Sequence, residues 1–287
     1  MDGREVSREP EIHAMRCMEI WGGYQAEQDA IGTPGLDIWV YSEPYHADLE
    51  GGDVHYVSLC GGGIITRLIV ADVSGHGSTV GVFSSALRAL MRKNINAKSQ
   101  RRLVRSLNRQ FTEMADLRRF ATAVVATYLA TDRTLSVCNA AHPRPLLYRA
   151  EARSWSSLDH EAEPSDRSAM NLPFGIDQGS TYDQFAVKLG PDDLVVVYTD
   201  ALTEAMSPTG EMLGEKGLIS IARQIDLLRP EEIGPALLAG VREHRGGVEA
   251  DDDVTLLVLR HNAAPPRKPG VAERLEVYAK VFGLKGV

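Results

Sequence analysis

Residues 71–81 read ADVSGHGSTVG, and the chain changes character within them. The run that leads in, residues 68–71, is apolar, as in a buried strand. It ends at Asp72, and Gly75 and Gly77 permit a sharp turn before a polar segment that opens a helix. The stretch therefore predicts a carboxylate at the tip of a buried strand, next to a turn into a helix.

Strand patterns also lie upstream of this stretch. Residues 36–45 alternate along LDIWVYSEPY and are ended by Pro44, and residues 54–60 form a second run. Three glycines at 61–63 join that run to the strand at 64–73. A phosphate-binding loop would need a helix after the glycines, but β-branched residues follow them, so we expect a hairpin turn.

Helices and strands come in blocks over the rest of the chain. Ser78 or Thr79 is the expected cap of the first helix. Hairpin-length links between many strands predict antiparallel sheets flanked by helices, an α+β fold. The expected elements are a short strand or helix at 15–24, helices at 78–94, 99–117, 214–229 and 230–245, strands at 121–130, 134–141, 145–150, 185–189, 194–201 and 253–260, and a polar loop at 151–170.

The composition limits the classes of function. A chain of 287 residues, 44% of them hydrophobic, can bury a large core. The formal net charge of -8 argues against general nucleic-acid binding, which usually shows a basic footprint. The three cysteines stand singly, without CxxC spacing, which argues against a zinc knuckle or a disulfide framework. No run approaches the roughly 18 apolar residues of a membrane span, and no signal-peptide pattern opens the chain, so a cytoplasmic location is expected.

Two segments are candidates for contacts with a partner. Residues 88–119 carry a concentration of positive charge with few acids, which indicates either a solvated helix face or a docking surface for an acidic or phosphorylated partner. Residues 263–287 predict a proline-containing linker and a short amphipathic helix, which either packs on the domain or binds a partner or a second copy. The basic residues are Arg88, Arg92, Lys93, Lys98, Arg101, Arg102, Arg105, Arg109, Arg118 and Arg119.

Carboxylates stand at the tips of four apolar strands. Asp53 begins one strand, Asp72 and Asp200 each end one, and the run 251–253 begins the last. If these tips converge, the like charges destabilise the fold unless a cation neutralises them, and oxygen ligands favour Mg²⁺ or Mn²⁺ over zinc. Taken singly, each aspartate is more simply explained as a turn residue or a helix cap.

Six motifs occur along the chain in a fixed order: GGDVHY (51–56), ADVSGHG (71–77), ATAVVATYLA (121–130) followed by NAAHPRPLLY (139–148), LPFGI (172–176), VVYTDALTEA (196–205) and ADDDVTLLVLR (250–260). Together they resemble the metal-dependent type 2C (PPM-type) serine/threonine protein phosphatases, and within them the bacterial branch that is like sporulation stage II protein E. The resemblance covers roughly residues 36–262.

The resemblance implies an α-β-β-α sandwich, in which two antiparallel sheets are flanked by helix pairs and a two-metal site lies at one end. Residues 1–35 are then an N-terminal segment, residues 36–262 the phosphatase domain, and residues 263–287 the linker and short C-terminal helix.

The resemblance also implies two Mg²⁺ or Mn²⁺ ions and the residues that hold them. Asp72 would bridge both ions, and the backbone carbonyl of Val73 would add a ligand. Asp53, Asp200 and Asp252 would complete the site.

The run of three aspartates leaves a choice of ligand. Asp252 is preferred because it stands two residues before Val254, as the family's ligand does. Asp253 occupies the adjacent, usually non-ligating place, and Asp251 is a less favoured substitute.

Two histidines and two alanines need separate interpretation. His76 is placed either to donate a proton to the leaving oxygen or to hold the turn by hydrogen bonds. His142 is expected to be structural or to support the ligands, with phosphate contact as the alternative. Ala201 and Ala141 replace glycines of the family pattern, and a methyl group at positive φ costs about 1 kcal/mol or more.

The implied function is hydrolysis of phosphoserine or phosphothreonine on a regulatory protein, such as an anti-anti-sigma-type partner in partner-switching signal transduction. The implied mechanism is direct attack on phosphorus by metal-bound hydroxide, without a protein nucleophile. Two alternatives remain: a catalytically weak protein that binds a phosphoprotein, and a hydrolase of small phosphoesters. Neither nucleic acid nor a membrane span is expected. A homodimer or a regulatory partner could contact residues 78–117 or the C-terminal tail.

Overall fold

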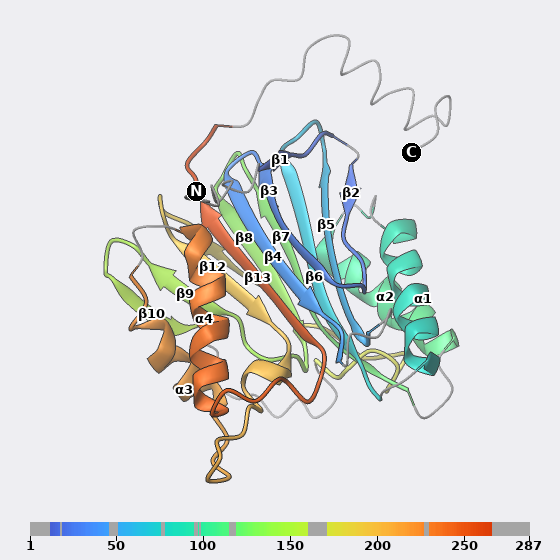
Figure 1. Cartoon of the computed structure of the whole chain (residues 1–287). Coiled ribbons are helices and arrows are strands. Elements are labelled where there is room, and N and C mark those ends of the chain that lie inside the picture. The colour runs from blue at the N-terminus through green and yellow to red at the C-terminus, as the bar shows by residue number, and fades with distance from the viewer. Residues whose placement is uncertain are drawn as a thin grey trace, which may run out of the picture.

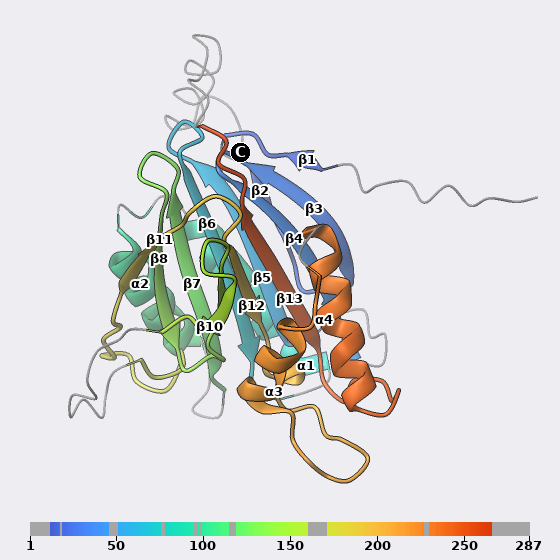
Figure 2. The ribbon, with the colours of Figure 1, turned by 90° about the vertical axis from the view of Figure 1, so that its left-hand side faces the viewer.

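The computed structural model describes residues 12–17, 19–45, 51–75, 78–94, 97, 99–114, 119–159, 171–226 and 230–265. Two β-sheets pack face to face, and a pair of helices covers the outer side of each sheet (Figure 1). The view turned by 90° shows the same four layers (Figure 2). The α+β sandwich predicted from the sequence is therefore confirmed.

The first sheet has seven strands and contains both ends of the described chain. Its pairings are antiparallel except that β1 runs parallel to β3. In order across the sheet, its strands are β1 (His13–Ala14), β3 (Glu27–Thr33), β4 (Leu36–Glu43), β13 (Val254–His261), β12 (Leu194–Tyr198), β9 (Leu146–Arg149) and β10 (Ser154–Ser157).

The second sheet has six strands, all paired antiparallel. Its centre is formed by β5, β6 and β7, which are among the most apolar runs of the sequence. In order across the sheet, its strands are β11 (Phe185–Lys188), β8 (Thr134–Ala140), β7 (Ala121–Leu129), β6 (Ile65–Val73), β5 (Asp53–Cys60) and β2 (Ile20–Trp21).

Two helix pairs cover the sheets. Helices α1 (Ser78–Asn94) and α2 (Gln100–Met114) pack on the six-stranded sheet, and α3 (Gly214–Ala222) and α4 (Pro230–His244) pack on the seven-stranded sheet (Figure 1). Helix α4 lies very close to β4, because a Cβ at Gly234 would lie 1.9 Å from the Trp39 ring. No helix in the described ranges is both long and apolar enough to cross a membrane.

Three apolar clusters follow from this layering. One fills the space between the sheets, one lies under α1 and α2, and one lies under α3 and α4. The central strands β5 and β6 are buried on both faces, which explains why they read as nearly continuous apolar runs rather than as alternating ones.

The structure corrects two expectations about secondary structure. The short element expected at 15–24 includes strand β2, but no element was predicted for residues 25–35, where β3 pairs along its whole length with β4. The polar stretch at 151–170 was expected to be a loop, but β10 begins within it and buries Trp155. The hairpin turn at 61–63 is confirmed, since all three glycines have positive φ. The predicted C-terminal helix lies outside the described residues.

Candidate metal centre

Strand register brings the four predicted carboxylates to one end of the sandwich. Asp53 is the first residue of β5 and is the direct cross-strand partner of Asp72 near the end of β6. Asp200 lies two residues after the end of β12 and starts a short 3₁₀ turn, Asp200–Leu202. Asp252 lies two residues before β13, which pairs with β12. The strand tips therefore converge as the sequence analysis supposed, at the lower end of the sheets in Figure 1.

Burial and mutual repulsion act on all four carboxyl groups. Burial, together with the charges of Asp200 and Asp252, raises the pKa of Asp72 to about 7. Burial also holds the pKa of Asp53 well above its usual range, with Asp72 as the next cause. The pKa values of Asp200 and Asp252 are raised too, first by burial and then by neighbouring acids. The cluster thus lacks the positive charge that its ionised form needs.

A divalent cation fits this chemistry. The site offers hard oxygen donors only, which suit Mg²⁺ or Mn²⁺. Within the described residues, no three Asp, Glu, His or Cys side chains are close enough together to form a ready-made metal site. Mg²⁺ usually keeps several of its waters and takes one or two carboxylates, so widely spaced carboxylates suit it better than they suit zinc.

The backbone next to Asp72 also faces the cluster. A Cβ at Gly52 would lie 3.0 Å from the Val73 carbonyl oxygen and 3.2 Å from Val80 of α1. Glycine at position 52 is therefore what allows β5, β6 and α1 to approach one another here. The Val73 carbonyl is the ligand that the resemblance implies, and it stays a prediction.

Asp253 differs from the candidate ligand Asp252 in that its carboxylate accepts backbone hydrogen bonds. Its carboxylate accepts hydrogen bonds from the backbone amides of Tyr45, at 2.7 Å, and Gly52, at 2.5 Å. These bonds tie the loop before β13 to the loop before β5. The geometry agrees with the expectation that Asp253 does not bind metal, because its oxygens are already engaged.

Thr199 holds Asp53 in place. Its hydroxyl donates a hydrogen bond of 2.8 Å to Asp53 Oδ2 and accepts one of 2.9 Å from the backbone amide of Thr255. All three residues are buried. This role was not predicted from the sequence, although Thr199 directly precedes Asp200 in the motif VVYTDALTEA. A hydroxyl next to a candidate ligand was the available signal.

Replacing Thr199 with valine keeps the shape of the side chain but removes the donor to Asp53. We expect Thr199→Val to weaken Mn²⁺ binding about tenfold, the usual size of an outer-shell effect. Titration calorimetry of the purified chain measures this. Thr66→Val is the matched control, because Thr66 is equally buried but bonds Thr33 at the other end of β6. Equal affinities in the two variants would contradict the role.

His142 is structural in this arrangement. It is buried, its Nδ1 lies 2.7 Å from the Thr122 hydroxyl, and its backbone amide donates to Asn139 Oδ1 at 2.8 Å. Burial lowers its pKa to about 3, so the ring is neutral. Thr122 is the cross-strand partner of Asp72, which places His142 behind a candidate ligand. His76 lies outside the described residues, and its role stays a prediction.

The two alanines at glycine positions of the family pattern differ in backbone conformation. Ala201 is buried in the 3₁₀ turn and does not have positive φ, so its methyl group causes no backbone strain. Ala141 has φ of 54°, in the left-handed region that glycine favours. The glycine preference of the family therefore has a backbone reason at position 141 and none of this kind at position 201.

We expect Ala141→Gly to stabilise the protein by about 0.5–1 kcal/mol, because the gain from relieving a left-handed alanine exceeds the added entropy of the unfolded chain. Urea unfolding measures the change. Ala186→Gly, at an exposed position of strand β11, is the control and should destabilise. A loss of stability in both variants would contradict the strain at position 141.

The sequence pattern of the family described as Stage II sporulation protein E (SpoIIE) matches residues 65–262. The chain belongs to the SpoIIE family. Protein IcfG of Synechocystis sp. (strain ATCC 27184 / PCC 6803 / Kazusa) is 22% identical over 284 residues, which cover 85% of this chain and 42% of IcfG. Phosphoserine phosphatase RsbU of Bacillus subtilis (strain 168) is 25% identical over 268 residues, which cover 90% of this chain and 71% of RsbU.

Solved structures share the fold of this SpoIIE family member. The RsbU and RsbW domains of Rv1364c from Mycobacterium tuberculosis match with a TM-score of 0.68 and 26% identity, over 82% of this chain and 63% of that chain. RsbX in complex with magnesium matches with a TM-score of 0.59 and 15% identity, over 82% of this chain and 99% of RsbX. The chain thus spans less than half of IcfG and less than two thirds of the Rv1364c chain.

Proposed function

We propose that this protein is a Mg²⁺- or Mn²⁺-dependent phosphatase that hydrolyses phosphoserine or phosphothreonine on a regulatory protein. The observation that carries the proposal is the cluster of four carboxylates at converging strand tips: Asp53 is buried, Asp72 and Asp200 are half-buried, Asp252 is exposed, and all four have raised pKa values. Membership of the SpoIIE family supports it, as does similarity to a relative named phosphoserine phosphatase.

The carboxylates have separate parts in the proposal. Asp72 is the cross-strand partner of Asp53 and interacts with the charges of Asp200 and Asp252, so it would contribute to holding both ions, and Asp53, Asp200 and Asp252 would complete the site. When bound, such ions lower the pKa of water and neutralise the charge of a phosphoryl group. RsbX, which shares the fold, is known in complex with magnesium.

The protein's own residues orient this chemistry. Thr199 fixes the Asp53 carboxylate, and Asp253 fixes the loops that carry Asp53 and Asp252. His76 would donate a proton to the leaving serine or threonine oxygen. No side chain is needed as nucleophile. Burial raises the pKa values of Cys60 and Cys138, which makes these two thiols poor nucleophiles.

The basic helices support a protein substrate. The side chains of Arg101, Arg102, Arg105 and Arg109 on α2 are exposed, with no acidic residue in the first turn of the helix. A face of this kind suits an acidic or phosphorylated protein, such as an anti-anti-sigma-type regulator. A homodimer contact through α1 and α2 or the tail, and a cytoplasmic location, remain predictions.

Phosphate release from a phosphoserine protein tests the proposal. The purified chain is assayed on that protein and on p-nitrophenyl phosphate, with Mn²⁺, with Mg²⁺ and with EDTA. We expect release from both substrates only with metal, and a higher kcat/KM for the phosphoprotein. Turnover of p-nitrophenyl phosphate alone would point to a small-phosphoester hydrolase. Binding of the phosphoprotein without turnover by folded, metal-loaded protein would contradict the enzymatic function.

A further inference from the structure

Arg245 is a buried cation at the end of helix α4. Only 7% of the residue is exposed. Its Nη2 donates a hydrogen bond of 2.6 Å to the carbonyl oxygen of Ala201 and lies 3.6 Å from Asp251 Oδ1. No local sequence pattern marks this arginine as buried, because a basic residue near a helix C-terminus is ordinarily a surface residue.

Both partners of Arg245 are chain neighbours of candidate metal ligands. Ala201 follows Asp200 in the 3₁₀ turn, and Asp251 precedes Asp252 in the loop before β13. One guanidinium group therefore joins two segments that come from different parts of the sequence. Those segments carry two of the four carboxylates.

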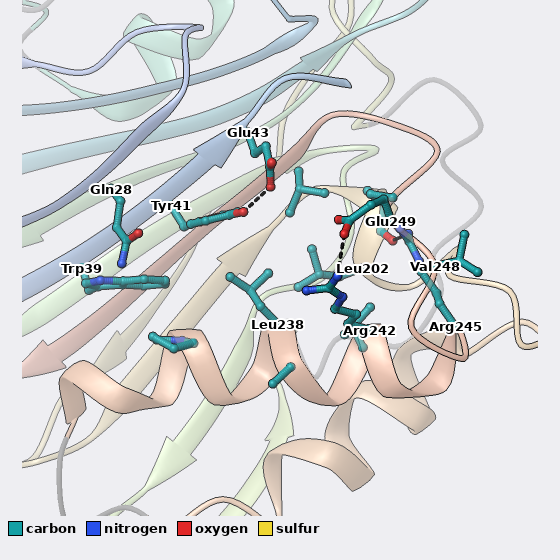
Figure 3. Close-up of a pocket in the computed structure, with 16 residues that line it drawn as sticks. Gln28, Trp39, Tyr41, Glu43, Leu202, Leu238, Arg242, Arg245, Val248 and Glu249 are labelled. Atoms are coloured by element: carbon teal, nitrogen blue, oxygen red, sulfur yellow. Dashed lines mark hydrogen bonds and ion pairs between the residues drawn. The ribbon is translucent and has the colours of Figure 1, made fainter. Parts of the chain in front are cut away.

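The contacts of Arg245 contrast with those of Arg242, three residues earlier on the same helix. Both line a cavity of about 360 Å³ between α4 and β4, which Figure 3 shows with its lining residues. Arg242 is 61% exposed and pairs with the exposed Glu249 at 2.6 Å across the cavity. That pair is solvated and contributes little.

Burying the Arg245 guanidinium costs free energy unless partners compensate it. Its partners are a backbone carbonyl and a carboxylate that is itself 81% exposed, so the compensation comes through these two loop segments. The two contacts compensate the buried guanidinium only while both loop segments keep their positions. The guanidinium group and the two loop segments therefore stabilise one another's positions.

We propose that Arg245 is a positioning residue for the metal centre: it fixes Asp200 through the Ala201 carbonyl and Asp252 through Asp251. The proposal rests on the metal site of the proposed function, but the clamp between the two loops is a property of the metal-free chain as well. Removing it should loosen both segments together and weaken ion binding.

Hydrogen exchange of the full-length, metal-free protein tests the clamp first. The amides of Thr203 and Glu204, which donate to the Asp200 carbonyl, report on the first segment, and the Asp253 amide, which donates to Asp252, reports on the second. In Arg245→Met we expect these amides to exchange about five- to tenfold faster, the effect of losing one net hydrogen bond. Arg242→Met is the matched control and should leave them unchanged.

Mn²⁺ titration of the same variants tests the consequence. Arg245→Met should weaken Mn²⁺ binding about tenfold or more, Arg245→Lys should recover part of the loss, and Arg242→Met should match the wild type. If Arg245→Met fails to fold, the variants Arg245→Lys and Asp251→Asn test the proposal instead. Asp251 is exposed, and its replacement removes only one of the two contacts of Arg245.

The outcomes separate the two proposals. Faster exchange confined to the two segments supports the clamp, whereas unchanged exchange, or equal acceleration throughout α4 and the sheets, overturns it. Unaltered Mn²⁺ affinity in Arg245→Met also overturns the positioning role. If the wild type binds no Mn²⁺, the proposed function fails, and the exchange data still judge the clamp on their own.

Discussion

Asp72→Asn is expected to lower metal-dependent phosphate release on the order of 10³-fold, because it removes the carboxylate that is the cross-strand partner of Asp53 and interacts with the charges of Asp200 and Asp252. Asparagine has the same size as aspartate, so packing at the end of β6 is preserved. Loss of one of several like charges should leave the metal-free protein as stable as the wild type or more so. Initial rates on p-nitrophenyl phosphate with Mn²⁺ measure the effect on activity.

Asp132→Asn is the control for this prediction. Asp132 is an exposed residue of the turn between β7 and β8, and its substitution should change neither activity nor stability. If Asp72→Asn retains wild-type activity, the carboxylate cluster is not the active site. If it is inactive but also much less stable without metal, the loss reflects unfolding and not a missing ligand.

The metal-free protein is expected to lose stability as the pH rises from about 5 to 8. The pKa of Asp72 is raised from 3.8 to about 7 in the folded state, so between these values the folded state holds more protons than the unfolded state. The free energy of unfolding therefore falls as the pH rises through this window. The raised pKa values of Asp53, Asp200 and Asp252 act in the same direction.

Divalent cations should reverse this loss. They bind the ionised carboxylates, so millimolar Mn²⁺ should raise the Tm by on the order of 5 °C at pH 8 and by less at pH 5. Thermal unfolding with EDTA and with Mn²⁺ at both pH values measures this. Asp72→Asn should show a smaller fall with pH and a smaller response to Mn²⁺. A wild-type Tm in EDTA that rises from pH 5 to 8 would contradict the assigned shifts.

The sequence predicts strands well where the apolar pattern is strong, and poorly where a strand forms only because a neighbouring strand pairs with it. Strand β12 is apolar throughout and β6 contains the apolar run 68–71, so the existence of both strands follows from composition alone. Strand β3 opens with Glu27, Gln28 and Asp29 and becomes a strand only because β4 supplies a partner along its length. Strand β10 is similar, with Trp155 as its single buried residue. The order of strands in each sheet is likewise a property of tertiary packing.

The candidate site shows the same division. The four carboxylates and the Val73 carbonyl could be proposed from strand tips and family motifs, because those features are local in sequence. Thr199 and Arg245 act across 146 and 44 positions of the chain, respectively, on Asp53 and Ala201. Only the folded structure brings these pairs together. The contact of Arg245 with Ala201 therefore could not be predicted from the spacing of residues in the sequence.

Mn²⁺ binding by titration calorimetry at pH 7.5 tests the central claim most directly. The account predicts two ions per chain for the wild type, binding that is weakened or lost in Asp72→Asn, and wild-type binding in Asp132→Asn. Folded wild-type protein that binds no Mn²⁺ or Mg²⁺ at millimolar concentrations would contradict it, and so would an Asp72→Asn variant that binds both ions with unchanged affinity.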